Sequence, residues 1–237
     1  MKNGFIAVID SGIGGLSVLK SLLNVMPNEN YVYFGDNDNV PYGSLSNDNL
    51  LMITMNNLLK LHIAFDLKAI VIGCNTISMT VLDKIRGYFD IPVFGVFPPV
   101  LLDAGKTLLI ATERTIEEYK KYRSNVVAVK EPFLASEIEK NCFSLSSINY
   151  NIFNFYNLGC FDSVILGCTH YFFVKNKIFD HLKPQKILSG ECYTAKQVKN
   201  YLQKTKSLGN AYRNSISFFG NHSKKNKTVW YQVVKMV

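Results

Sequence analysis

The stretch that decides the fold reads Ala-Ile-Val-Ile-Gly-Cys-Asn-Thr, residues 69–76, and its pattern returns as Ser-Val-Ile-Leu-Gly-Cys-Thr-His, residues 163–170. Both begin with a short apolar run, typical of a buried strand in a parallel sheet, and continue with glycine, cysteine and two polar residues. Ligands of open α/β sheets bind at the carboxyl ends of strands, so we expect Cys74 and Cys168 at functional edges. The repeat predicts two similar half-molecules that each offer one thiol.

Short apolar runs alternate with helical patterns along the whole chain. We expect further strands at residues 5–9, 31–34, 91–97, 106–111, 126–129 and 186–189. Helices are expected at residues 16–23, 47–61, 76–86, 112–122, 133–140 and 193–204. Residues 215–219 and 229–234 are expected to be strands that return to the first half. This alternation predicts an α/β fold of two similar domains with parallel-rich sheets, one of residues 1–97 plus 206–237 and one of residues 98–205.

Bulk properties exclude several classes of protein. The 237 residues carry a formal charge of +8, but no basic motif is interleaved with aromatic residues, so we expect a solvated surface and no nucleic-acid partner. No apolar segment reaches the length of a membrane span and no signal peptide is recognisable, so we expect a cytoplasmic protein without a membrane partner. None of the five cysteines forms a CxxC pair, which argues against a metal site and a disulfide framework.

The first strand ends in Asp-Ser-Gly-Ile-Gly-Gly, residues 10–15, before a helical pattern. A dinucleotide-binding GxGxxG motif would need glycine at Ser17, so we expect these glycines to bring backbone amides close to an anionic group such as a carboxylate. Asp10 alone would be interpreted as a helix N-cap, but its position beside the Cys74 strand favours a site residue. Cys74 itself precedes a predicted helix, and a helix start lowers the pKa of a nearby thiol.

Four blocks together resemble the glutamate racemases of bacteria, in that order and at similar spacing. They are residues 10–16 (DSGIGGL), Gly35-Asp36 with residues 40–43 (VPYG), residues 74–76 (CNT) and residues 167–171 (GCTHY). The resemblance implies a cofactor-independent isomerase of two α/β domains, with the site in the cleft between them. It implies glutamate as the small-molecule substrate and a product, D-glutamate, that is used in peptidoglycan synthesis. We leave open a homodimer.

The resemblance also assigns roles to residues of this chain. The catalytic group would contain Cys74 and Cys168 as the acid/base pair, with Asp10, His170 and Glu139 in support. The substrate would be bound by Asp10, Ser11, Tyr42, Gly43, Asn75, Thr76, Thr112, Thr115, Thr169 and His170. The chain departs from the family in the loop at residues 35–40 (GDNDNV) and in a short segment at residues 98–106.

Two thiols suit racemisation because one thiolate can abstract the α-proton while a thiol on the opposite face returns another. An isolated cysteine at a strand end is usually a core residue, and the duplicated context is what favours catalysis here. No lysine has a context specific for pyridoxal phosphate. The alternatives are a racemase of aspartate or another amino acid, and an impaired homologue that acts as a binding protein. A hydrolase with one thiol nucleophile is disfavoured by the second cysteine strand.

Overall fold

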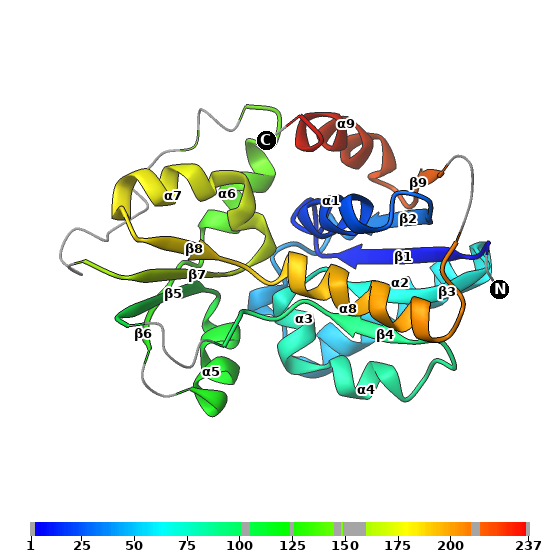
Figure 1. The fold of residues 1–237 in the computed structure, drawn as a ribbon, viewed down its shortest axis with the longest axis horizontal. Coiled ribbons are helices and arrows are strands. Elements are labelled where there is room, and N and C mark those ends of the chain that lie inside the picture. The colour runs from blue at the N-terminus through cyan, green and yellow to red at the C-terminus, as the bar shows by residue number, and fades with distance from the viewer. Residues whose placement is uncertain are drawn as a thin grey trace.

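The computed structural model describes residues 3–100, 105–123, 126–144, 148, 160–209 and 214–235, which form two sheets of parallel strands (Figure 1). The strands are β1 (Phe5–Asp10), β2 (Asn30–Gly35), β3 (Leu67–Ile72), β4 (Val93–Gly95), β5 (Thr107–Ala111), β6 (Val127–Lys130), β7 (Ser163–Gly167), β8 (Lys186–Leu188) and β9 (Ile216–Phe218). The helices are α1 (Leu16–Val25), α2 (Asn47–Ala64), α3 (Asn75–Thr80), α4 (Leu82–Arg86), α5 (Glu113–Tyr122), α6 (Leu134–Lys140), α7 (Lys175–Leu182), α8 (Glu191–Lys204) and α9 (Ser223–Val233). Short 3₁₀ helices, η1 (Tyr42–Ser44) and η4 (Thr169–Val174), complete the description. The predicted α/β class with parallel sheets is confirmed.

The first sheet brings the ends of β1 and β3 to one edge. Its order is β4-β3-β1-β2-β9, and each neighbouring pair is parallel. Ile9 of β1 lies beside Ile72 of β3, and the amide of Gly73 donates a hydrogen bond of 2.7 Å to the carbonyl of Ile9. Asp10 and Cys74 therefore leave the sheet at the same carboxyl edge.

The second sheet brings the ends of β5 and β7 to its own carboxyl edge. Its order is β6-β5-β7-β8, again with parallel neighbours. Ala111 of β5 lies beside Gly167 of β7. The residues that follow, Thr112 and Cys168, therefore start from neighbouring positions.

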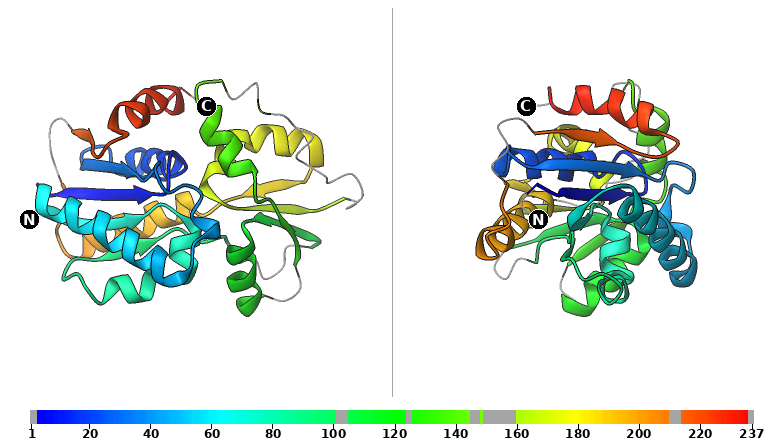
Figure 2. Two further views of the ribbon diagram at one scale, coloured as in Figure 1. Left: turned by 180° about the vertical axis from the view of Figure 1, so that it is seen from behind. Right: turned by 90° about the vertical axis from the view of Figure 1, so that its right-hand side faces the viewer.

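Helices cover both faces of the first sheet because its buried side chains alternate. Ile6 and Val8 belong to the core that also contains α1, α8 and α9, while Ala7 and Ile9 pack with α2, α3 and α4. In Figure 1 α8 lies in front of this sheet, and from behind, in Figure 2, α2 lies in front of it. Both faces of these strands are thus buried, which explains their near-continuous apolar sequence.

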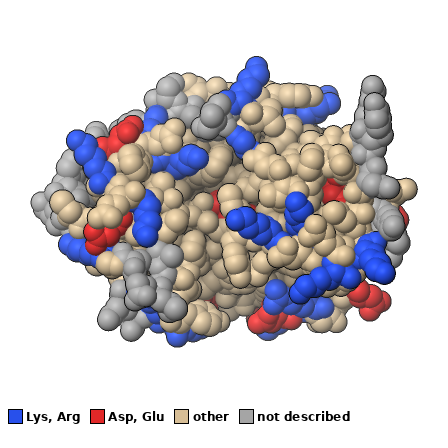
Figure 3. Space-filling model, in the orientation of Figure 1, with Lys and Arg blue, Asp and Glu red and all other residues tan. Residues whose placement is uncertain are grey.

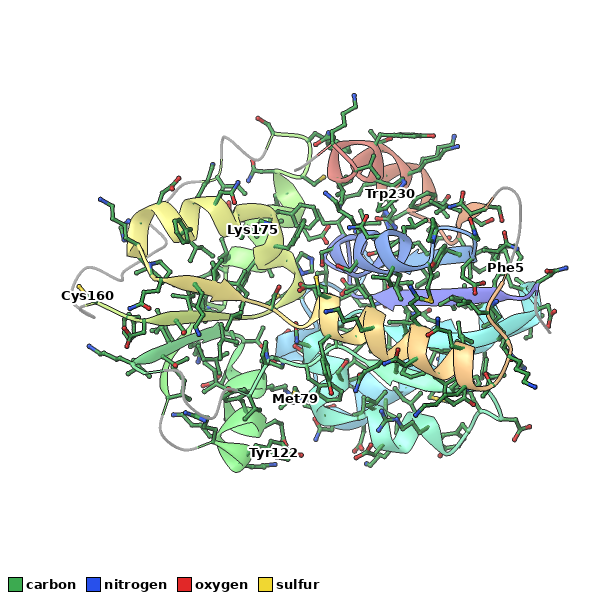
Figure 4. All side chains as sticks on the ribbon, viewed as in Figure 1. Phe5, Met79, Tyr122, Cys160, Lys175 and Trp230 are labelled. Carbon is green, nitrogen blue, oxygen red and sulfur yellow. The ribbon has the colours of Figure 1, made fainter. Side chains whose placement is uncertain are left out.

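The C-terminal segment corrects one expectation. Residues 229–234 were expected to be a strand because valine and aromatic residues dominate them, but they lie in α9 except for the last. The buried positions of α9 are Asn226, Val229, Trp230 and Val233, a spacing of three and four residues that presents one helical face. Trp230 lies between α9 and α1, which are in contact (Figure 4). Burial of this face against α1 outweighs the strand propensity of the segment.

Other boundaries also differ from the sequence expectation. The helix expected over residues 76–86 is interrupted at Val81, whose φ of −127° and ψ of 0° are not helical, so it forms α3 and α4. Of the strand expected over residues 91–97, only Val93–Gly95 (β4) pairs with a neighbouring strand. The division into domains at residues 97/98 and 205/206 stays a prediction, and α8, which it assigns to the second domain, contacts α1 and β4 of the first sheet. No helix in the described part of the chain is long and apolar enough to cross a membrane.

Candidate active site

A small cavity lies where the carboxyl ends of the two sheets face each other. Its walls are formed by Ser11, Val40, Pro41, Tyr42, Gly43, Cys74, Asn75, Thr76, Thr112, Ala135, Cys168, Thr169 and His170. Most of the residues predicted for the site therefore line one cavity. Its volume is about 20 Å³, which is room for one or two water molecules. Among the described residues, no group of three or more His, Cys, Asp or Glu side chains could hold a metal ion.

Cys74 reaches the cavity from the first sheet. It is the N-cap of α3, its carbonyl accepts a hydrogen bond from the amide of Ser78, and the residue is buried. Burial and the charge of Asp10 raise the pKa of the Cys74 thiol well above its usual value. The amides of Ile77 and Thr76 act in the opposite direction, as expected for a helix start, but they do not outweigh the loss of solvent.

Cys168 reaches the cavity from the second sheet and has a different environment. Its Sγ lies 3.7 Å from Nδ1 of His170, and the cysteine is half-buried. The other imidazole nitrogen, Nε2, lies 2.8 Å from Oε1 of Glu139. Burial acts to lower the pKa of His170, but its contacts with Cys168 and Glu139 outweigh this and raise it well above the usual value. The thiol of Cys168 thus contacts the imidazole of His170, which in turn is oriented by the carboxylate of Glu139.

Glu139 is a buried carboxylate whose two oxygens receive contacts from four segments. Oε1 accepts from the amide of Ile13 at 2.5 Å and contacts His170, while Oε2 accepts from Nδ2 of Asn37 at 3.0 Å and from Nζ of Lys225 at 2.8 Å. An ionised carboxylate offers about four lone-pair positions, so all of them are used. Burial alone would raise the pKa of Glu139, but the hydrogen bonds and charges of His170 and Lys225 hold it at about 2. Glu139 is not part of the cavity wall but contacts His170, which is.

Asp10 also lies behind the cavity wall. Its Oδ1 accepts from the amide of Gly12 at 2.8 Å, and its Oδ2 accepts from the hydroxyl of Thr169 at 3.2 Å. Burial raises the pKa of Asp10, and the charge of His170 partly opposes this. Asp10 therefore links the first sheet to Thr169 of the second, and its charge acts on Cys74.

The glycine-rich turn packs directly against residues of the second half. A Cβ at Gly12 would overlap Glu139 Oε1, and one at Gly14 would lie 2.6 Å from His170 Nδ1. Glycine is needed at both positions because a side chain would displace the groups that support Cys168. The amides of this turn were expected to lie near a carboxylate, and in the described structure they donate to the chain's own Asp10 and Glu139.

Threonines join the two halves on the opposite side of the cavity. The hydroxyls of Thr76 and Thr112 lie 3.3 Å apart. Thr112 is the N-cap of α5, and its hydroxyl lies 3.0 Å from that of Thr115, which is buried behind the wall. Nearby, α3 packs against α5, with Met79 at this junction (Figure 4).

Two further predicted residues, Tyr42 and Asn75, use their side chains in hydrogen bonds to residues beside the cavity. The hydroxyl of Tyr42 donates a hydrogen bond of 2.5 Å to Oδ2 of Asp36, which also accepts from Asn57 at 3.1 Å. Nδ2 of Asn75 donates to the carbonyl of Val96 at 3.2 Å. An amide NH₂ group has a second N–H to donate, and Asn75 lines the cavity.

Sequence reasoning missed two groups of residues. Ala135 lines the cavity but has no chemistry that a sequence pattern could single out, and Val40 and Pro41 were part of a motif block but were given no role in the site. Asn37 and Lys225 bind Glu139. Lys225 could not be placed because the segment that follows it was expected to be a strand. The remaining basic residues are spread over the face shown in Figure 3 rather than gathered into one patch.

Comparison with known proteins places these features among racemases. No protein-family model matches the chain. The chain is 36% identical to the glutamate racemase of Clostridium acetobutylicum over 86% of both chains, and 35% identical to that of Clostridium novyi over 86% of this chain and 85% of the relative. The glutamate racemase of Francisella tularensis, solved in complex with D-glutamate, superposes with a TM-score of 0.76 at 26% identity, covering 98% of this chain and 95% of that one.

Proposed function

Since the chain belongs to the glutamate racemase family and is an isomerase of that kind, we propose that it interconverts L- and D-glutamate by moving the α-proton between Cys74 and Cys168. No cofactor takes part in the proposed reaction. The observation that carries the proposal is the pair of thiols on one cavity, each following a strand of a different sheet. The D-glutamate held by the Francisella tularensis relative supports glutamate as the substrate.

The reaction needs a base on one face of the α-carbon and an acid on the other. One sulfur, as thiolate, takes the α-proton, and the C–H electron pair passes to the α-carbon and the adjoining carboxylate. The other sulfur, as thiol, gives its proton to the opposite face, so the protein returns with the two protonation states exchanged. The reverse reaction uses the same groups in exchanged roles, which is why both thiols must face one small cavity.

Negative charge on the substrate carboxylate grows as the proton leaves. The hydroxyl of Thr76 and the amide of Asn75 line the cavity and are donors suited to that charge, whereas the hydroxyls of Ser11 and Thr169 donate to Asp10. In the closed cavity burial favours the neutral thiol of Cys74. The α-ammonium group of a bound amino acid brings a positive charge, which favours the thiolate and so offsets part of that penalty.

An amino acid does not fit a volume of about 20 Å³, so the proposed cycle includes an opening step. A second pocket of about 240 Å³ adjoins the cavity and shares Pro41, Gly43, Thr112 and Ala135 with it. We infer that substrate enters through this pocket when the Thr76–Thr112 contact separates. Closing around the substrate then removes water, which strengthens every polar interaction with the developing charge.

Two expectations from the sequence belong to this proposal. The D-glutamate formed would serve peptidoglycan synthesis, as family membership implies. A homodimer is also kept as an expectation, and light scattering from the purified protein decides it.

The test of function follows optical rotation with L-glutamate, D-glutamate and L-aspartate as separate substrates. Wild type is expected to racemise both glutamate enantiomers and to prefer glutamate over aspartate. Cys74→Ala and Cys168→Ala are each expected to lose at least about 1,000-fold in kcat/KM, because each removes an acid/base group that the reaction needs. Cys160→Ala, which changes an exposed cysteine outside the cavity, is the matched control and should retain full activity.

The outcomes separate the alternatives. Racemisation of aspartate but not glutamate would keep the fold and the two-thiol site but overturn the substrate. Survival of activity in one cysteine variant would overturn the two-thiol mechanism. A folded wild type that is silent with all three substrates, yet binds glutamate in calorimetry, would favour a binding protein.

A further inference from the structure

Lys225 makes a contact that the reaction described above does not use. It lies on α9, which packs against elements of the first sheet, whereas its partner Glu139 lies on α6 in the second half. The Nζ–Oε2 distance is 2.8 Å, and the exposed fractions of the two side chains are 27% and 5%. Lys225 therefore brings a positive charge from the C-terminal helix to the carboxylate behind Cys168.

We propose that Lys225 is a positioning residue for the Cys168 half of the site, because its ammonium group compensates Glu139 and leaves His170 free to exchange its proton. This inference rests on the proposed racemisation only for its activity readout. Lys225 touches neither the cavity nor either sulfur in the described structure, so it acts through Glu139 and His170.

The proposed role of Lys225 follows from the charge balance of the buried Glu139 carboxylate. A buried carboxylate requires a counter-charge, since an unpaired buried charge is strongly unfavourable. If His170 were the only cation beside Glu139, the imidazole could not give up its proton without leaving the buried carboxylate unpaired. A second, permanent cation on Oε2 satisfies the carboxylate whether or not the imidazole is protonated. His170 can then respond to Cys168, whose sulfur lies 3.7 Å from Nδ1.

The surroundings of the pair contain other titratable groups, and none of them can replace this charge. Asp10 from β1, Tyr33 from β2, Cys142 after α6 and Cys168 after β7 interact with Glu139 or His170. All four are neutral or negative. Among the described residues, the cations that contact the Glu139 carboxylate are His170 and Lys225. Loss of Lys225 is therefore expected to make His170 hold its proton more tightly and to disfavour a second negative charge at Cys168.

The test compares three variants of the full chain. Lys225→Met removes the charge but keeps much of the stem, Lys225→Arg keeps the charge, and Lys224→Met removes an exposed charge from the neighbouring position. In Lys225→Met the acid-side limb of the kcat/KM profile is expected to move up by about one pH unit, with about a tenfold loss at pH 7. Lys225→Arg should restore the wild-type limb, and Lys224→Met should leave it unchanged.

A second readout does not depend on turnover. The pH dependence of Cys168 alkylation by iodoacetamide, followed on its peptide by mass spectrometry, is expected to move in the same direction in Lys225→Met. If wild type fails to racemise glutamate, the proposed function is overturned, and the alkylation profile alone still decides the role of Lys225.

Two results would overturn the inference. One is an alkylation profile and a pH limb that are the same in Lys225→Met and wild type. The other is a loss of activity that is equal at every pH and is not restored in Lys225→Arg, which marks a merely structural role. If Lys225→Met does not fold, Lys225→Gln is measured in the same way and judged by the same results.

Discussion

The two cysteines follow the same strand-glycine pattern but receive different support from the protein. Cys74 is buried, takes its contacts from backbone amides and faces the negative charge of Asp10. Cys168 is half-buried and adjoins a chain of side chains that runs through His170 and Glu139 to Lys225. The proposed two-thiol site is thus built from two unlike halves. The proposed mechanism does not need similar neighbours at the two sulfurs; it needs only that each sulfur can lose and regain a proton.

The largest expected difference between the halves is in thiol reactivity. At pH 7 iodoacetamide should alkylate Cys74 at least about 100-fold more slowly than Cys168, because each unit by which burial raises the pKa of Cys74 lowers its thiolate fraction tenfold. Peptide mass spectrometry of wild type measures both rates, with Cys160 as the reference for an exposed cysteine. Equal rates for Cys74 and Cys168 would contradict the difference in their environments.

The next effect comes from removing the charge at the centre of the Cys168 half. Glu139→Gln should lower the free energy of unfolding at pH 7 by about 3 kcal/mol, since it leaves His170 and Lys225 without their buried counter-charge. Urea unfolding measures this loss. Glu137→Gln, whose ion pair with Lys140 is partly exposed, is the control and should change stability by less than about 1 kcal/mol.

The same pair of variants gives a pH test with a definite sign. The pKa of Glu139 is held at about 2, below its ordinary value of 4.5. Its ionisation therefore stabilises the folded state above pH 4.5, and this contribution is lost as the pH falls towards 2. The stability gap between wild type and Glu139→Gln should be widest near neutral pH and should shrink from pH 5 to pH 3. A gap that widens on acidification would refute the depressed pKa.

A smaller effect is expected where the halves meet at the glycine turn. Gly14→Ala places a Cβ 2.6 Å from both His170 Nδ1 and Thr169 Oγ1, so the supporting side chains must shift. We expect a loss of about 2 kcal/mol in stability together with reduced kcat. Gly87→Ala is the matched control, because the nearest atom to its Cβ lies at 3.6 Å, and it should leave both quantities unchanged within error. Full activity in Gly14→Ala would show that the close approach is not needed.

The sequence was sufficient for the parts of the molecule that local patterns control. The two cysteine strands, the glycine turn and most of the polar residues of the cavity are short motifs next to strand ends, where fold class alone dictates their position. Residues 229–234 could not be assigned from their composition, because contact with α1 decides their helical state. Lys225 lies on the same helix, α9, so its contact with Glu139 could not be predicted from the sequence either.

The small volume of the cavity also lies beyond sequence reasoning. It depends on Thr76, Thr112, Asp10 and Thr169 meeting across segments that are far apart in the chain. The expectation that a helix start would lower the pKa of Cys74 named a real effect, yet burial in the closed cavity is larger. Magnitudes of this kind follow from tertiary contacts and not from spacing.

The most direct test of the two-thiol account is the origin of the hydrogen in the first product molecules. Wild type is mixed with L-glutamate in D₂O, and both enantiomers are separated and analysed for α-deuterium after a few turnovers. Thiols exchange with solvent, so the account predicts that D-glutamate carries deuterium at the α-carbon while the remaining L-glutamate still carries protium. D-Glutamate that retains the original α-proton would show that one group serves both faces and would contradict the account.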